Sequence, residues 1–385
     1  MKRAMMIACA AALASPGCEK SREPSGNGSG KPPVTLTVGH VGHDHQIALG
    51  VAALEGERFK RDYGIYLKEV KPREVYDLIE GDQPLARLLI RKVKGGSAMP
   101  AAMEAGQLDI GLGGVAAVAK FVDKGQPFKI IAPLHTDGDF LVMKTDSPVA
   151  DWPSFVSAAK ATQRPVKIGY KAPVAVAKLI FVRALAAEGV KWADGAVGPD
   201  VKVVMINVHG AKNIIPALQS GEIDGFVMNQ PQPSIAKDRK LGKIVADLKD
   251  LPPAGRWSRH PCCCVAATDK VLKDHAAAVK GLLKTIILAT HLIQRDTDLA
   301  VRCAAAWTKQ SKAVEKDSVP GIPYLAEPIE EYMAGMKTWA VLMTEERQYT
   351  RGLAGLTPEQ VVERICDMSL CEQAVRELRA KGVLE

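Results

Sequence analysis

Aromatic side chains are scarce in this sequence of 385 residues, at only 5%. A binding site built mainly from stacked rings is therefore disfavoured. Basic residues outnumber acidic ones by 51 to 43, but no run of five or six like charges marks a nucleic-acid surface. The motifs G-x-x-x-x-G-K-[ST], G-x-G-x-x-G, H-E-x-x-H and G-x-S-x-G are also missing, so four common enzyme classes lose their simplest support.

The remaining composition is that of an ordinary globular protein, with 47% hydrophobic and 24% charged residues. A chain of this length is typical of two lobes, and it can bury a core without disulfides or metals.

The N-terminus predicts export. Residues 2–3 are basic, and residues 4–14 form an apolar run that is too short for a bilayer span of about 20 helical residues but fits a signal-peptide core. The run leads through Ser-Pro-Gly to Cys18, which resembles a bacterial lipoprotein processing site. Pro16 departs from the usual pattern, so secretion without a lipid is the alternative. Residues 19–33 are rich in Gly, Ser and Pro, which predicts a flexible tether.

Export would place the later cysteines in an oxidising compartment that permits disulfides. Cys366 and Cys371 bracket a short turn between two helical patterns, so a local disulfide between them and two free thiols both remain open. The other cysteines of the exported chain are Cys262, Cys263, Cys264 and Cys303.

The body of the sequence repeats one layout. The first half has a β-rich run at 34–40, a helical pattern from about 46 to 60 and a strand at 65–70. The second half repeats this order with a strand at 166–170, a helix from about 174 to 188 and a strand at 201–206. More sharply, residues 101–109 align without gaps to 216–224. Both segments end a helix at a glycine suited to the left-handed C-cap, and Asp109 or Asp224 then opens a strand.

Each half therefore predicts strand–helix–strand–helix–strand, an α/β lobe whose mixed sheet is flanked by helices. Ligands of such sheets lie beyond the carboxyl ends of the strands, against helix N-termini. Two facing lobes would form a cleft that holds a ligand.

Four segments carry a family resemblance: Val38-Gly39-His40, 105–111, 166–170 and 220–225. Together they resemble type II periplasmic solute-binding proteins of the nitrate/sulfonate/taurine class, which also includes thiamine-pyrimidine binding proteins and synthases. The resemblance spans roughly residues 30 to 270. It implies a two-lobed type II fold that closes on its solute, with a signal peptide at 1–18, a tether at 19–33, lobe 1 at 34–143 plus 256–385, and lobe 2 at 144–255.

The same resemblance implies a function. We expect a monomeric, lipid-anchored receptor on the periplasmic side of the membrane, which captures a small polar or anionic solute for the permease and ATPase of an ABC importer. It implies no catalysis, no cofactor and no nucleic-acid partner. An envelope metal-binding or metal-delivery protein is the alternative, and an enzyme or sensory module on the same fold is a third hypothesis.

The family's ligand loops map onto both halves of the chain. In the first half they are His40, His43, Asp44 and His45, then Gly96 and Ser97, Gly113 and Gly114, and His135 and Thr136. In the second half they are Tyr170, Lys171, Val174 and Ala175, then His209 and Lys212, and Asn229 and Gln230.

The loop after the first strand is richer in histidine than an oxyanion site requires. In one interpretation, one histidine caps the helix, another faces solvent and the third donates to the ligand. In a second, the loop contacts a polar solute directly. In a third, His43 and His45 bind a metal, with Cys262 and Cys264 as partners.

The segment His260-Pro-Cys-Cys-Cys-Val-Ala is the second unusual feature. Alternation along a strand would put His260, Cys262 and Cys264 on one face, although three cysteines also suit an ordinary buried strand. The fungal thiamine-pyrimidine synthases of this fold carry a triple cysteine followed, after one residue, by a fourth, and that motif is associated with iron. Ala266 stands at the fourth position here, so the motif is incomplete.

Overall fold

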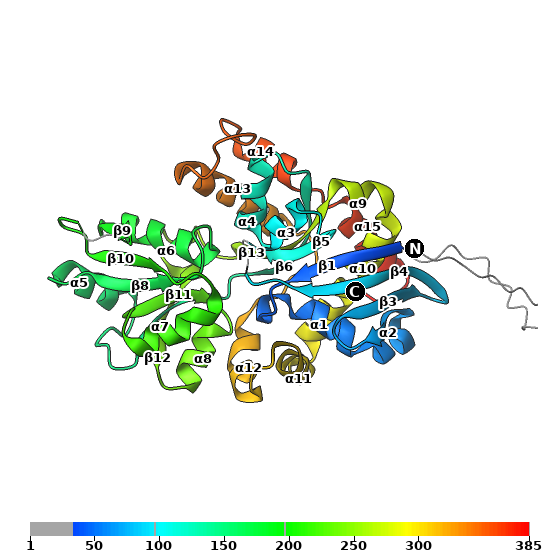
Figure 1. The fold of residues 1–385 in the computed structure, drawn as a ribbon, viewed down its shortest axis with the longest axis horizontal. Helices are drawn as coiled ribbons and strands as arrows, with labels where there is room; N and C mark the ends of the chain where they lie inside the picture. Colours follow the sequence, from blue (N-terminus) through cyan, green and yellow to red (C-terminus); the bar gives the residue numbers. More distant parts are fainter. Residues whose placement is uncertain (1–33, 96–97, 196–197, 385) are drawn as a thin grey trace, which may run out of the picture. The chain divides into compact units, whose positions relative to one another are not determined.

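The computed structural model describes residues 34–95, 98–195 and 198–384. The proposed signal peptide, Cys18, the tether, Gly96 and Ser97 lie outside the described residues. The described chain forms two mixed sheets flanked by helices (Figure 1), which confirms the predicted fold class.

The first sheet has seven strands, and its order mixes early and late parts of the chain. From one edge to the other it runs β2 (Ile65–Lys71), β3 (Val75–Glu80), β4 (Gln83–Lys92), β1 (Val34–His40), β5 (Ile110–Gly114), β13 (Pro261–Thr268) and β6 (Phe128–Thr136).

The second sheet has six strands, all from the middle of the chain. Its order is β12 (Gly242–Asp247), β7 (Asp139–Lys144), β11 (Gly225–Asn229), β8 (Val166–Tyr170), β10 (Val203–Asn207) and β9 (Trp192–Asp194). Because β7 pairs antiparallel with β11 and β12, residues 139–143 belong to this sheet. The chain therefore first passes from the first sheet to the second at residues 137–138, several residues before the predicted lobe boundary at 143.

Helices cover both sheets. Against the first lie α1 (Ile47–Leu54), α2 (Gly56–Tyr63), α3 (Ala98–Glu104), α4 (Val115–Asp123), α9 (Asp269–Asp274), α10 (Ala276–Arg295), α13 (Glu330–Glu345), α14 (Pro358–Ile365) and α15 (Ser369–Ala380). With the second lie α5 (Trp152–Ala161), α6 (Val176–Ala187), α7 (Ile214–Ser220) and α8 (Gln232–Asp238). Two further helices pack on other helices: α11 (Thr297–Thr308) on α1 and α10, and α12 (Lys312–Ser318) on α11 and α8. The short 3-10 turns are η1 (Asp44–Gln46), η2 (Ala211–Asn213), η3 (Leu248–Asp250) and η4 (Val319–Gly321).

One helix, α10, is long and apolar enough to cross a membrane, but 78% of its most apolar window is buried inside the protein. It packs on β2, β3 and β4 and against α1, α11 and α15. The buried Lys284 on this helix pairs with Glu80 at 2.8 Å and Glu377 at 2.7 Å. We therefore describe α10 as a core helix.

The internal repeat extends to individual atoms. Gly39 on β1 faces Leu108, and Gly169 on β8 faces Ile223, so closely that an added Cβ would lie 2.3 and 2.6 Å from those side chains. In each half an aspartate next to that large side chain accepts a hydrogen bond from a backbone N–H of the glycine's strand. The Thr37 N–H donates to Asp109 at 2.8 Å, and the Lys167 N–H donates to Asp224 at 2.9 Å.

The repeat fails at the second strand of the first half. β8 pairs in parallel with β10, as the layout predicts. β1 instead pairs in parallel with β4, because β2, β3 and β4 form an antiparallel meander that places β2 at the edge of the sheet. The sequence analysis did not anticipate β3 and β4.

The local disulfide is not formed. Cys366 and Cys371 are free thiols, as are the other four cysteines of the described chain. The Cys371 thiol donates instead to the Ala326 carbonyl at 3.4 Å.

Candidate functional site

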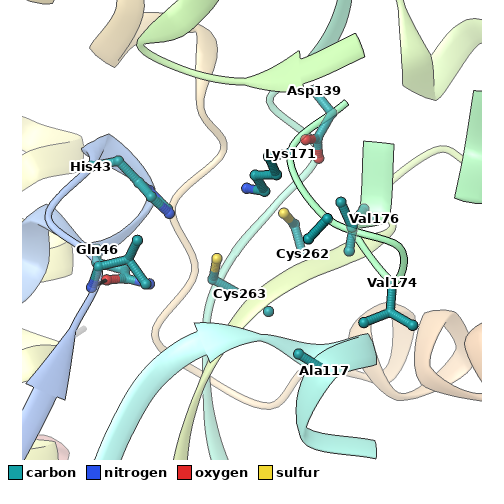
Figure 2. Close-up of a pocket in the computed structure, with 13 residues that line it drawn as sticks. His43, Gln46, Ala117, Asp139, Lys171, Val174, Val176, Cys262 and Cys263 are labelled. Carbon is teal, nitrogen blue, oxygen red and sulfur yellow. Dashed lines mark hydrogen bonds between the residues drawn. The ribbon is translucent and has the colours of Figure 1, made fainter. Parts of the chain in front are cut away.

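A cavity lies where the loops after β1 and β8 meet strand β13 (Figure 2). The first sheet and its helices line it with Val41, His43, Gln46, Gly114, Ala117, Cys262 and Cys263, and the second sheet with Asp139, Lys171, Ala172, Val174, Ala175 and Val176. The side chains of His43, Lys171, Cys262 and Cys263 converge on its centre.

The cavity is small. Its volume is about 40 Å³, and one water needs roughly 10–15 Å³. In this arrangement of the two sheets the space therefore suits a few waters, an ion or a very small solute.

Lys171 is the basic side chain of the lining. It follows the carboxyl end of β8, and its ammonium donates to the Asn229 side chain at the end of the neighbouring β11. Asn229 is held in turn, because its amide donates to the Gln230 carbonyl at 2.6 Å. The second sheet thus presents one positive charge in a fixed position.

Gln46 shapes the opposite wall. Its side-chain oxygen accepts the Val41 N–H at 2.7 Å, and its amide donates to the Leu112 carbonyl at 2.8 Å. These bonds tie the histidine loop to strand β5. Gln46 was missed in the sequence analysis because it reads as part of a helix start, where a polar residue carries no special signal.

The histidine loop, residues 40–45, lies against the cavity, with His43 half-buried in its wall. His43 stands at the N-cap of η1 but makes no side-chain capping bond, and its Nδ1 is buried without a partner among the described residues. His40 and His45 are buried. The interpretation with one capping and one solvent-facing histidine is therefore wrong. Burial, with Lys171 nearby, holds the pKa of His43 well below its usual value.

His45 and His135 lie together beneath the cavity floor. Their rings are 3.8 Å apart between centroids, and both are fully buried. The Nδ1 of His45 lies 3.5 Å from the Cys262 sulfur. Burial, with His135 beside it, lowers the pKa of His45 well below its usual value, so its imidazole is neutral at pH 7.

Strand β13 departs from simple alternation, and this changes which cysteines meet. Its pairing with β6 shifts register on both sides of Cys263, so Cys262 and Cys263 both reach the cavity. Cys264 points away and donates to the Gly113 carbonyl at 3.5 Å. The predicted common face of His260, Cys262 and Cys264 is therefore wrong, because a β-bulge breaks the period of two.

The two cavity cysteines are chemically unlike. The hydrogen bond from Cys262 lowers the pKa of the Cys263 thiol to about 5, against its burial. Burial raises the pKa of Cys262 well above its usual value.

His260 lies behind the cavity, at the crossing between the sheets. Its ring nitrogens lie 3.0 Å from an Asp137 oxygen and 3.4 Å from an Asp139 oxygen, and all three residues are buried. Although burial alone would lower the pKa of His260, the two carboxylates raise it to about 9. A charged histidine therefore joins the segment after β6 to the start of β13.

The predicted ligand residues divide between the cavity and other places. The structure brings His43, Gly114, Lys171, Val174 and Ala175 to the cavity wall. His45, His135 and Asn229 lie directly behind that wall, where they contact Cys262, His45 and Lys171 respectively.

The remaining predicted residues that the structure describes do not line the cavity. His40 packs on Trp307, and Asp44 accepts from Ser318. Tyr170 donates to Asp194 at 3.0 Å, and Gly113 accepts from Cys264. His209 and Lys212 are exposed, and the Asn213 side chain of the same loop donates to the Val208 carbonyl at 2.7 Å. Thr136 and Gln230 are buried and are not part of the cavity lining.

The fold is shared with binding components of ABC importers. The structure superposes on a zinc-bound ligand-binding component from Staphylococcus aureus with a TM-score of 0.69, at 13% identity, over 89% of this chain and 99% of that one. The periplasmic nitrate-binding protein of Synechocystis superposes with a TM-score of 0.65, at 14% identity, over 91% of this chain and 91% of that one. The periplasmic aliphatic sulphonate-binding protein of Escherichia coli superposes with a TM-score of 0.61, at 16% identity, over 87% of this chain and 92% of that one.

These structures share with this chain the type II periplasmic-binding-protein fold that the sequence analysis predicted. More particularly, the chain belongs to the NMT1-like family, whose model matches residues 29–307. An uncharacterized protein of Methanocaldococcus jannaschii is 40% identical over 104 residues, which are 27% of this chain and 72% of that protein.

Proposed function

We propose that this protein is the solute-binding component of an ABC importer, and that it holds a small polar or anionic solute in the cavity between its two sheets. One observation carries the proposal: Lys171 of the second sheet and the histidine and cysteine groups of the first sheet converge on one small cavity. A ligand there contacts both sheets, so it stabilises the arrangement that brings them together.

The contacts between the two sheets' helices support a closing motion. Arg183 on α6 pairs with Glu345 and Glu346 at the end of α13, and Ser234 on α8 donates to Asp317 on α12 at 2.8 Å. Such polar pairs exchange readily with water, which suits an interface that opens and closes.

The proposal extends to partners and location. We infer a monomer without enzymatic activity that serves a permease and ATPase pair from the periplasmic side of the membrane. It is anchored there by a lipid on Cys18. Cys18→Ala should release the protein into the soluble fraction and leave the melting temperature of the folded part unchanged, and a protein that stays in the membrane fraction contradicts the anchor.

The binding test uses the solute that native mass spectrometry finds on gently purified protein. That solute should raise the melting temperature and lower the radius of gyration in small-angle scattering. Lys171→Met should weaken its binding by about 1.5–3 kcal/mol, the usual loss for a hydrogen bond to a charged group. Lys212→Met is the matched control, because Lys212 is exposed and outside the cavity. Tight binding without compaction would contradict the receptor function.

A further inference from the structure

Four potential metal ligands meet at the floor of the cavity. One ligand atom from each of His45, His135, Cys262 and Cys263 lies within 4.8 Å of the other three. Two imidazoles and two thiols are a donor set that zinc prefers in proteins. All four residues are buried, and two of them, Cys262 and Cys263, line the cavity.

The distances suit a tetrahedral ion of zinc's size. With metal–sulfur bonds near 2.3 Å and metal–nitrogen bonds near 2.0 Å, the ligand atoms of a tetrahedral site lie about 3.3–3.8 Å apart. The His45 Nδ1 to Cys262 Sγ distance is already 3.5 Å. No pair of ligand atoms is more than 4.8 Å apart, so the widest pair needs to close by at most about 1.5 Å.

The two histidines are held in the tautomers that a metal needs. His45 lies with its Nε2 3.1 Å from the Gly138 carbonyl, so this nitrogen carries the proton and Nδ1 presents a lone pair toward Cys262. His135 lies with its Nδ1 3.0 Å from the Thr136 carbonyl, so its Nε2 presents the lone pair. Backbone carbonyls orient metal-ligating histidines in this way.

An unpartnered atom gives independent support. The His135 Nε2 is buried and has no hydrogen-bond partner within the part of the chain that the structure describes. A buried nitrogen lone pair without a partner is costly in free energy. A metal ion at the floor of the cavity would satisfy it.

From these observations we infer that His45, His135, Cys262 and Cys263 bind one soft, tetrahedral transition-metal ion of the zinc type. The inference rests on the proposed function only in that both use this cavity. Every ligand comes from the first sheet and the loop after β1, so the ion binds without any closing of the second sheet. Cys262 and Cys263 line the cavity, which leaves the ion within reach of a polar solute that Lys171 also contacts.

The test titrates the full-length, fully reduced protein with Co²⁺ in the absence of oxygen. One equivalent should bind and give thiolate-to-cobalt charge-transfer bands together with the strong visible absorption of tetrahedral cobalt. Zn²⁺ should displace it. Cys262→Ser and Cys263→Ser should each lose the charge-transfer intensity of one thiolate and bind Co²⁺ more weakly. His135→Gln should keep both thiolate bands but also bind the ion more weakly.

Cys264→Ser is the matched control, because it changes an equally buried neighbour on the same strand whose sulfur points to Gly113. It should bind Co²⁺ as the unchanged protein does. The inference would be overturned if the Co²⁺ charge-transfer bands of Cys263→Ser were the same as those of the unchanged protein. It would also be overturned if Cys264→Ser lost as much of their intensity as Cys263→Ser does. Far-ultraviolet circular dichroism shows that each variant is folded.

The outcome separates this inference from the proposed function. Stoichiometric Co²⁺ without a change in the radius of gyration supports the metal site, whatever the solute test gives. Compaction by the copurified solute, with no metal bound in either the solute-free or the solute-loaded protein, refutes the metal site and leaves the receptor function standing.

Discussion

The loops after β1 and β8 begin from equivalent strands but hold different chemistry. After β1 the chain enters a 3-10 turn with three buried residues, Asp44, His45 and Gln46. After β8 it enters an irregular segment from Lys171 to Ala175 that supplies one cation and small apolar walls. The strands that lead into the two loops are nevertheless built alike. Each has a glycine, Gly39 or Gly169, against which a large side chain packs, and each donates a backbone N–H to an aspartate, Asp109 or Asp224.

The comparison shows that the scaffold repeats while the site does not. The repeated residues fix how a helix ends and how the next strand packs, and those demands are the same in both halves. The cavity needs complementary walls, so its two sides differ. The following variants test whether the halves are alike in stability and unlike in chemistry.

The largest effect is expected at His260, which joins the two halves and has no counterpart in the repeat. His260→Ala leaves Asp137 and Asp139 buried without their cation, which should lower the free energy of unfolding by about 3–5 kcal/mol. Urea denaturation at pH 7 measures this loss. His209→Asn is the control, because His209 is exposed, and it should change stability by less than about 0.5 kcal/mol.

His260 also predicts the direction of the pH dependence. Its pKa in the folded protein is raised to about 9 from 6.5, so its stabilisation is fully present below pH 6.5 and is lost as the pH rises through 9. The expected loss is about 3 kcal/mol over this window. Urea midpoints should fall between pH 6.5 and 9.5 in the unchanged protein but not in His260→Ala, and equal falls in both would contradict the assignment.

The next largest effect tests the likeness of the two halves. Gly39→Ala and Gly169→Ala each force a methyl group against a buried side chain, which should cost about 1–3 kcal/mol in both. Gly114→Ala is the control, because its nearest atom would lie 3.7 Å away. Urea denaturation measures the free energy of unfolding of each variant. A large loss for one glycine variant and none for the other would show that the two halves are not packed equally tightly at this position.

A smaller effect is expected at Asp44, an acid of the first loop that the second loop lacks. Burial, together with the charge of Glu315, raises its pKa well above the usual value. A raised carboxyl pKa makes stability fall as the pH rises through it. Asp44→Asn should therefore increase stability at pH 7 by on the order of 1 kcal/mol, with little change at pH 4.

The control for Asp44→Asn is Asp82→Asn, an exposed turn residue of the same sheet. Melting temperatures at pH 4 and pH 7 provide the comparison. A loss of stability in Asp44→Asn at pH 7 would mean that the carboxylate is bound in its charged form.

The smallest effect on stability is expected where the two halves touch. Arg183→Ala removes a partly exposed ion pair with Glu345 and Glu346, which should cost at most about 1 kcal/mol. The solute-free protein should nevertheless have a larger radius of gyration in small-angle scattering. Arg164→Ala is the control, because its partner Asp224 lies in its own half, and it should leave that radius unchanged.

Much of the scaffold could be predicted because it depends on local patterns. The strand at 166–170 has the expected bounds, and the glycine C-caps at Gly106 and Gly221 have positive φ angles of 68° and 80°. These positions are decided by residues a few places apart. The meander of β3 and β4 escaped prediction, since strand pairing depends on a partner elsewhere in the chain.

The candidate site was predictable only in part. The strand ends place the loops after β1 and β8, and the family resemblance singled out His43 and Lys171 within them. The choice of Cys263 over Cys264 depends on register shifts against β6, and no residue near them signals the shift. The proximity of His135 to His45 likewise depends on β6 lying beside η1.

The sequence by itself determined the two α/β halves and the helix ends at Gly106 and Gly221, because each of these follows from patterns within a short stretch of chain. Only the tertiary structure decided which side chains share the cavity floor. Cys262 and Cys263 meet His45 and His135 across more than a hundred residues of chain. Such a meeting is set by sheet order and by a bulge in β13, which the side-chain pattern of a single segment does not specify.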